Sequence, residues 1–159
     1  MTSPPSPQPP AGQDWLLLTE SPLDAGVALE WIGRAACGGE VAFVGVVRDH
    51  AEGRSGVTAV DYEAYEDQIL PRMAELVAAA RDRVPGLGAV CVWHRTGRLV
   101  VGEASVVVAV SSAHRAQAFE ACRFVIDTLK EALPIWKHEH FEGGSGWSPA
   151  AHPVRPVAR

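Results

Sequence analysis

The stretch that decides the fold class occupies residues 104–132 and has the sequence ASVVVAVSSAHRAQAFEACRFVIDTLKEA. Its first seven residues are rich in valine and predict a strand over 104–110. Ser112 is a suitable cap for a long helix from Ala113 to about Ala132. The helical spacing predicts a buried stripe made of Phe119, Cys122, Ile126 and Leu129. A buried strand that leads directly into an amphipathic helix indicates a mixed α and β structure.

Other strands and helices follow on both sides of this stretch. Strands are predicted over 15–19, 40–47, 57–64, 89–93 and 135–141, and helices over 21–36 and 66–84. Gly45, inside a strand, indicates a bulge or a close backbone approach. Because the elements alternate without βαβ regularity, we expect an α+β fold with a mostly antiparallel sheet and two long helices.

Composition limits the class of protein. The chain has 159 residues, of which 47% are hydrophobic and 21% charged, which suits one globular domain. Residues 1–13 and 148–159 are proline-rich and are expected to be flexible tails around a domain at 14–147. The net charge of −5 argues against a nucleic-acid partner. Neither a signal peptide nor an apolar run of membrane-spanning length is recognisable, so we expect a soluble, cytoplasmic protein without a membrane partner.

The cysteines and lysines of the chain limit the kinds of reaction that it could catalyse. Cys37, Cys91 and Cys122 are odd in number and far apart, which favours reduced thiols over disulfides or a zinc site. The chain has twelve arginines but two lysines, Lys130 and Lys137, both in one short stretch. A genome that replaces lysine by arginine explains this pattern as well as a chemical need does. The chemical interpretation is that a desolvated lysine can lose its proton and act as nucleophile or base, whereas arginine cannot.

The predicted helix start at His114 and Arg115 is a candidate anion site. Free N–H groups and the positive end of the helix dipole attract an anion there. Two cations at a helix N-terminus are unfavourable without a partner, which favours a bound phosphate over two simply solvated side chains. Elsewhere, Arg48 ends a predicted strand. His138 and His140 could share one strand face, but two histidines without a third ligand at useful spacing are weak evidence for a metal site.

Several stretches, in this order and spacing, together resemble the large subunit of molybdopterin synthase. They are Gly45-Val-Val-Arg-Asp-His50, Tyr62-Glu-Ala-Tyr65, His94-Arg-Thr-Gly97 with Gly102-Glu103, Ser112-Ala-His-Arg115, and Lys130-Glu-Ala-Leu-Pro-Ile-Trp-Lys-His-Glu139, before a glycine-rich turn and Trp147. The resemblance covers almost the whole expected domain. It departs at Val46, where the family often has a basic residue, and at the proline-rich ends.

The resemblance implies a fold, an activity and partners. The fold is an α/β hammerhead. The activity is the formation of the molybdopterin dithiolene from cyclic pyranopterin monophosphate. Sulfur comes from the thiocarboxylated C-terminus of a small ubiquitin-like subunit, and a homodimeric core carries one small subunit at each end, as a heterotetramer. Neither a metal nor an organic cofactor is implied.

The resemblance also implies roles for individual residues. Lys130 and Lys137 are the implied catalytic residues and also bind substrate. The other implied substrate-binding residues are Arg48, His114, Arg115, His138 and Glu139. Two alternatives remain open: a non-catalytic module of the same fold that binds a pterin or nucleotide phosphate, and a metal-dependent hydrolase that uses His138 and His140.

The length of the predicted helix adds one expectation about assembly. His114 and Lys130 lie sixteen residues apart on it, which at about 1.5 Å per residue separates their backbones by roughly 24 Å. Both side chains can hardly surround one small substrate. We therefore expect each active site to combine His114 and Arg115 of one protomer with Lys130 and Lys137 of the other.

Overall fold

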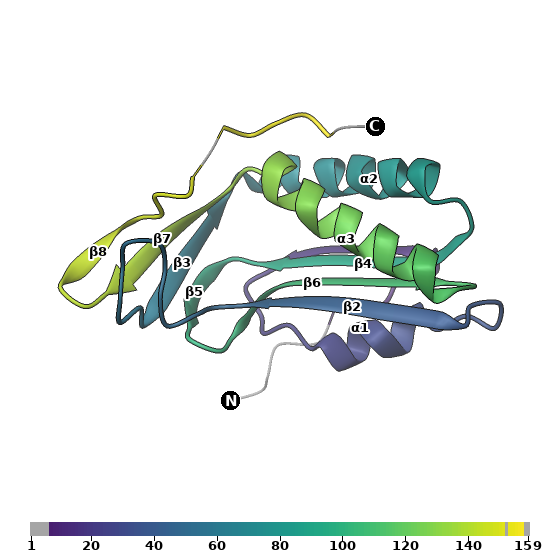
Figure 1. Ribbon diagram of the computed structural model, residues 1–159, viewed down its shortest axis with the longest axis horizontal. Helices are drawn as coiled ribbons and strands as arrows, with labels where there is room; N and C mark the ends of the chain where they lie inside the picture. The colour runs from purple at the N-terminus through teal and green to yellow at the C-terminus, as the bar shows by residue number, and fades with distance from the viewer. Residues whose placement is uncertain (1–6, 152, 158–159) are drawn as a thin grey trace.

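Two four-stranded sheets organise the molecule, which is described here as a computed structural model over residues 7–151 and 153–157. The central sheet contains β1 (Asp14–Thr19), β2 (Gly39–Val46), β4 (Leu87–Arg95) and β6 (Ala104–Ser112), in the order β1-β4-β6-β2. Only its β1–β4 pair is parallel. The second sheet, β3 (Ala59–Ala64), β5 (Gly97–Val100), β7 (Ile135–Phe141) and β8 (Gly144–Trp147), is antiparallel and projects from one end of the first (Figure 1).

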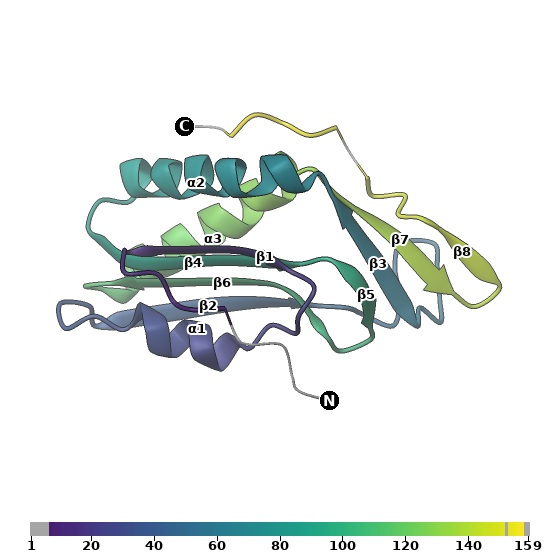
Figure 2. The ribbon, with the colours of Figure 1, turned by 180° about the vertical axis from the view of Figure 1, so that it is seen from behind.

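Helices cover both faces of the central sheet. The two long helices, α2 (Glu66–Arg83) and α3 (Arg115–Ala132), lie on one face, and the short α1 (Ala25–Ile32) lies on the other (Figure 2). Since neighbouring strand residues point to opposite faces, Val90 and Val92 pack under α2 and α3 while Cys91 and Trp93 pack against α1. Burial on both faces explains why β4 and β6 are almost continuously apolar. None of the described helices is long and apolar enough to cross a membrane.

The expected α+β class, the mainly antiparallel pairing and the two long helices are confirmed, and β7 has the predicted bounds. Two of the three predicted helix starts were wrong, while α2 begins at Glu66 as predicted. Asp24, not Ser21, caps α1, since its carboxylate accepts a hydrogen bond from the N–H of Gly26 at 2.8 Å. Ser112 completes β6 instead of capping α3, which begins after His114 with no side-chain cap. The start of α3 moved because β6 extends through Ser112, the residue that the sequence rule had assigned to the cap.

The predicted buried stripe of α3 was wrong at one position. Cys122, Ile126 and Leu129 are buried, but Phe119 is 63% exposed. Ala118 takes its place under the helix, because it lies one full turn before Cys122. The prediction also missed the short strands β5 and β8, which contain too few β-branched residues to stand out.

The expectation for Gly45 is confirmed. The pairing of β2 with β6 shifts register between Gly45 and Val46. A Cβ at Gly45 would lie 2.6 Å from Cγ1 of Val106, closer than two carbon atoms can pack. The missing side chain therefore lets β2 approach β6 closely at the end of the strand that leads to Arg48.

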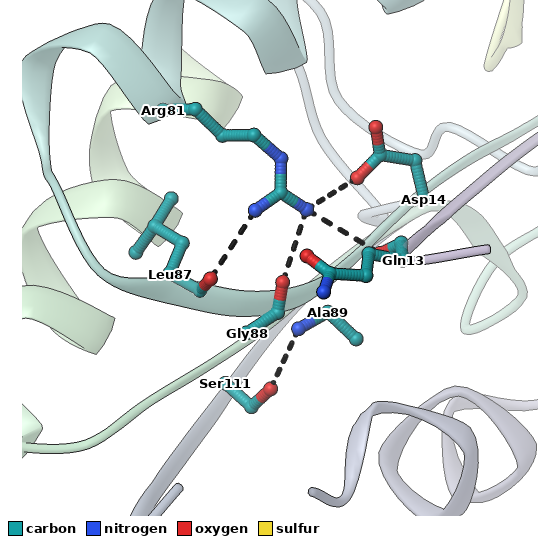
Figure 3. A network of polar contacts seen from close by, with 7 residues as sticks. All are labelled: Gln13, Asp14, Arg81, Leu87, Gly88, Ala89 and Ser111. Carbon is teal, nitrogen blue, oxygen red and sulfur yellow. Dashed lines mark hydrogen bonds and ion pairs between the residues drawn. The ribbon is translucent and has the colours of Figure 1, made fainter. Parts of the chain in front are cut away.

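A network around Arg81 fixes the start of β4 (Figure 3). The guanidinium of Arg81 donates to the carbonyls of Leu87, Gly88 and Gln13 and pairs with the carboxylate of Asp14. The N–H of Ala89 donates to Oγ of Ser111 at 2.9 Å. These contacts join the end of α2 to β1, β4 and β6, and they anchor the strand whose other end carries His94.

Of the expected tails, residues 1–6, 152 and 158–159 lie outside the described part. The described residues after β8 lie along the end of α3 (Figure 1). The N–H of Ser148 donates to the carbonyl of Lys137 at 2.9 Å, and that of Arg155 donates to the carbonyl of Glu131 at 2.8 Å. This segment therefore forms part of the surroundings of both lysines.

Candidate functional site

A cavity of about 630 Å³ opens where the end of α3, the strand β7 and the ends of β2, β4 and β6 meet. This size suits a small-molecule site. Its polar and charged lining includes Arg48, Tyr62, His94, Ser105, Lys130 and Lys137. Its apolar lining includes Phe43, Val44, Val106, Leu129, Leu133, Ile135 and Trp136, and Ser148, Ala150, Ala151 and Val154 form a wall from the C-terminal segment.

Both lysines reach this cavity because of how α3 ends. Lys130 lies in the last turn, and Pro134 follows the end of the helix, where its ring and missing N–H prevent a further turn. The chain then enters β7 at Ile135, and Lys137 projects into the same cavity. The two lysines therefore line one cavity.

The surroundings of Lys137 lower the pKa of its amine below the ordinary lysine value. The main cause is partial burial, which removes hydration from the ammonium form. The charges of Lys130 and Arg48 lower the pKa further, while Glu139 opposes them. The side chain still reaches solvent at the mouth of the cavity. Lys137 is therefore a solvent-accessible amine that loses its proton more readily than a surface lysine.

Tyr62 and His94 form the floor beneath Lys137, and the sequence analysis gave neither a role. Tyr62 lies directly opposite Lys137 in the β3–β7 pair, with Nζ of Lys137 5.9 Å from the centre of its ring. The rings of Tyr62 and His94 are 5.4 Å apart in an edge-to-face arrangement. Burial raises the pKa of the Tyr62 hydroxyl. The signal for His94 was its place at the end of an apolar strand, but its burial depends on the tertiary fold.

His94 is a neutral imidazole with a defined tautomer. Burial lowers its pKa to about 4, and the charge of Lys137 acts in the same direction. Its Nδ1 lies 2.9 Å from the carbonyl oxygen of Arg95. Because a carbonyl oxygen only accepts, Nδ1 carries the proton and Nε2 keeps a free lone pair. His94 thus contributes a hydrogen-bond acceptor to the cavity lining and no positive charge.

Glu139 lies in β7 two residues after Lys137 and is only 5% exposed. Its carboxylate pairs with Arg54 at 2.9 Å, and Arg54 also donates to the carbonyl of Gly146 at 3.1 Å. The pair connects the loop after β2 to the second sheet. Glu139 influences Lys137 through its charge, although it is not among the residues that line the cavity.

His138 occupies a different environment from its neighbours in β7. Alternation along the strand directs it to the face opposite Lys137 and Glu139. There its ring lies 5.3 Å from that of His140 and 5.1 Å from that of Trp147. The expectation that His138 lines the same pocket as the lysines has no support in this arrangement.

His114 and Arg115 begin α3 and are exposed at the end of the helix remote from the cavity. Gly38 and Gly39 pack against this turn, and the N–H of Gly38 donates to the carbonyl of Ala113 at 3.3 Å. The cap of α3 uses no side chain and its first turn has no acidic residue, so the local charge suits an anion. Within one chain, this helix start and the two lysines do not meet.

Comparisons with known proteins agree with the resemblance seen in the motifs. Residues 18–132 match the family described as MoaE protein. The chain is 41% identical over 137 residues to the molybdopterin synthase catalytic subunit of Culex quinquefasciatus, which covers 86% of this chain and 87% of that protein. The crystal structure of molybdopterin synthase from Staphylococcus aureus matches with a TM-score of 0.78 and 31% identity, over 85% of this chain and 96% of that one.

A protein–protein complex of subunits 1 and 2 of the molybdopterin-converting factor from Helicobacter pylori also shares the fold. Its TM-score is 0.70 at 20% identity, over 90% of this chain and 95% of that chain. The family match covers residues 18–132, which is most of the chain and includes Lys130. The chain belongs to the MoaE family, the family of molybdopterin synthase catalytic subunits.

Proposed function

We propose that the cavity transfers sulfur from the thiocarboxylated C-terminus of a small ubiquitin-like subunit to cyclic pyranopterin monophosphate, which yields the molybdopterin dithiolene. The observation that carries this proposal is that Lys130, Lys137 and Arg48 line one cavity of about 630 Å³. That cavity combines a cationic rim with the amine of Lys137, whose pKa is lowered below the ordinary lysine value. The small-subunit partner is supported by the Helicobacter pylori complex of two subunits.

The proposed chemistry divides the work between the lysines. Two thiocarboxylates are used, one for each sulfur of the dithiolene. Each time, the thiocarboxylate sulfur attacks a substrate carbon and displaces the oxygen bound there, which leaves as water or stays on the phosphate as its ring opens. Water then cleaves the bond between that sulfur and the partner's carbonyl carbon. The sulfur stays on the substrate, and the partner leaves as a carboxylate. The neutral amine of Lys137 takes the proton from the attacking water, and the ammonium of Lys130 stabilises the oxyanion that forms.

Arginine and helix-start contacts are proposed to hold the substrate's phosphate. Arg48 lines the cavity and can bind a phosphate with two parallel hydrogen bonds. His114 and Arg115 are proposed to reach the same phosphate from a second copy of the chain. The neutral His94 is proposed to orient the Lys137 ammonium through its free Nε2 before that amine loses its proton.

The edge strand β2 supports a homodimer with shared sites. It lies at the edge of the central sheet and exposes Phe43, Val44 and Val46, the last by 51%. An unpaired apolar edge favours pairing with another strand. If β2 pairs antiparallel with its symmetry mate, its Gly39 end, beside His114, approaches the mate's Val46 end, beside the cavity. The eight residues of β2, at about 3.4 Å each, span roughly the length of α3, which is the distance that separates His114 from Lys130.

We also propose a heterotetramer, with one small subunit at the catalytic cavity of each protomer, and a cytoplasmic location, which the reduced thiols expected from the sequence favour. Residues 14–147 are proposed to be the catalytic domain, with extensions on both sides.

The direct test supplies both substrates. The purified chain is incubated with a thiocarboxylated small subunit and cyclic pyranopterin monophosphate. Molybdopterin is the expected product, and mass spectrometry detects it. The matched control replaces the thiocarboxylate by an ordinary carboxylate, which carries no sulfur to transfer. Absence of product with the thiocarboxylated subunit, while both substrates bind, contradicts the proposal.

The pH dependence of sulfur transfer is expected to report on Lys137. Since the neutral amine is the active form, kcat rises with pH, and the lowered pKa brings this rise below the pH range of an ordinary lysine. Glu139 favours the ammonium form, so Glu139→Gln is expected to move the rise to still lower pH. The measurement is kcat against pH, with the exposed Glu142→Gln as control. A rise that stays in place or moves to higher pH in Glu139→Gln contradicts the assignment.

A further inference from the structure

Three side chains of types that can bind a metal meet on the face of the second sheet opposite Lys137. His138 and His140 alternate along β7 and therefore share this face. Asp61 of β3 lies directly opposite His138 in the antiparallel register. The sequence offered no third ligand at useful spacing, because Asp61 is brought there only by the pairing of β3 with β7.

The three ligating atoms are close together. One atom from each of Asp61, His138 and His140 lies within 4.8 Å of the other two. Nε2 of His140 is 2.6 Å from Oδ2 of Asp61, and the two imidazole rings are 5.3 Å apart. All three residues are half-buried, so solvent can reach the site and the strands limit its movement. Ligands bound at about 2.0–2.2 Å to one ion lie within roughly 4 Å of each other, so small rotations of the side chains suffice.

A hydrogen bond explains why His140 and Asp61 lie close together, but it does not explain the position of His138. The exposed pair of His50 and Asp49 makes a similar contact at 2.7 Å. What distinguishes the β7 group is the second imidazole, held between the rings of His140 and Trp147. Two imidazoles and one carboxylate on paired strands form the ligand set typical of a metal site with an open position.

We propose that Asp61, His138 and His140 bind a borderline divalent cation, with zinc as the best-fitting ion and water completing its coordination. Two nitrogen ligands favour zinc over magnesium or calcium, which prefer oxygen. The ion replaces the proton shared by His140 and Asp61, and that proton goes to solvent. It joins β7 to β3 on one face while Lys137 faces the cavity on the other. The site thus stiffens the strand that carries Lys137 and takes no part in sulfur transfer.

The test measures zinc binding by the untagged full chain. After chelator treatment, isothermal titration calorimetry with zinc is expected to show one ion per chain, and zinc is expected to raise Tm. The decisive variant is His138→Ala, because it leaves the His140–Asp61 pair in place. It is expected to weaken zinc binding at least about tenfold, as is His140→Ala. The control His50→Ala, which removes the histidine of the other His–Asp pair, is expected to bind zinc as the unmodified chain does.

Two results overturn the proposal. One is that the unmodified chain binds no zinc to saturation. The other is that His138→Ala, with an unchanged circular dichroism spectrum, binds zinc as tightly as the unmodified chain. If His138→Ala does not fold, His138→Gln replaces it, since glutamine keeps a polar side chain of similar reach without the imidazole.

Discussion

Lys137→Arg is expected to reduce the rate of sulfur transfer at least about 100-fold while the substrate still binds with nearly unchanged affinity. Arginine preserves the positive charge that attracts a phosphate, but its guanidinium does not lose a proton at physiological pH. The structure makes Lys137 the sensitive position, since its pKa is already lowered by partial burial and by Lys130 and Arg48. Single-turnover rates and calorimetric binding of cyclic pyranopterin monophosphate separate the two effects.

Controls make this experiment specific. Lys130→Arg keeps the positive charge that the proposed mechanism requires at Lys130 and changes only its shape, so it is expected to reduce the rate less than Lys137→Arg does. Arg123→Lys makes the reverse exchange on an exposed position of α3 and is expected to leave the rate unchanged. Full turnover in both lysine variants would contradict catalysis by either amine and would favour a non-catalytic module that binds a pterin or nucleotide phosphate.

The sequence predicted the elements that carry the lysines because the signals there are local. Pro134 ends α3, and the alternation after it gives β7 its bounds, so Lys130 and Lys137 must lie near one another. The same alternation separates His138 from Lys137, a consequence that follows from strand geometry alone. The prediction that His138 lines the same pocket as the lysines did not take this alternation into account.

The rest of the site depends on tertiary contacts that no local pattern encodes. Arg54 is one of twelve arginines, and only the folded loop after β2 selects it as the partner of Glu139. The neutral state of His94 results from burial beneath the cavity. Asp61 joins the two histidines through the register of β3 with β7, two strands far apart in the sequence. Each of these features arises only in the packed structure and has no local signal in the sequence.

Mixing two inactive variants, His114→Ala and Lys130→Ala, is expected to restore activity in mixed dimers. The two positions lie at opposite ends of the 18-residue helix α3, too far apart to contact one small substrate from a single chain. If each site combines both protomers, a mixed dimer contains one site with both mutations and one site with neither. It should then show about half the activity of the unmodified dimer.

The control for this experiment is a mixture in which both variants carry changes at the same end of α3, His114→Ala with Arg115→Ala. Sharing across the dimer then leaves no intact site, because each site takes both residues from one protomer and that protomer is always defective. Mixed dimers are verified by two different affinity tags purified in sequence, and activity is measured as molybdopterin formed per dimer. Activity in the first mixture but not in the second requires that the helix start of one chain serve the lysines of the other. Verified mixed dimers of His114→Ala and Lys130→Ala that stay inactive would instead place all the substrate contacts within one chain, which the length of α3 makes physically difficult.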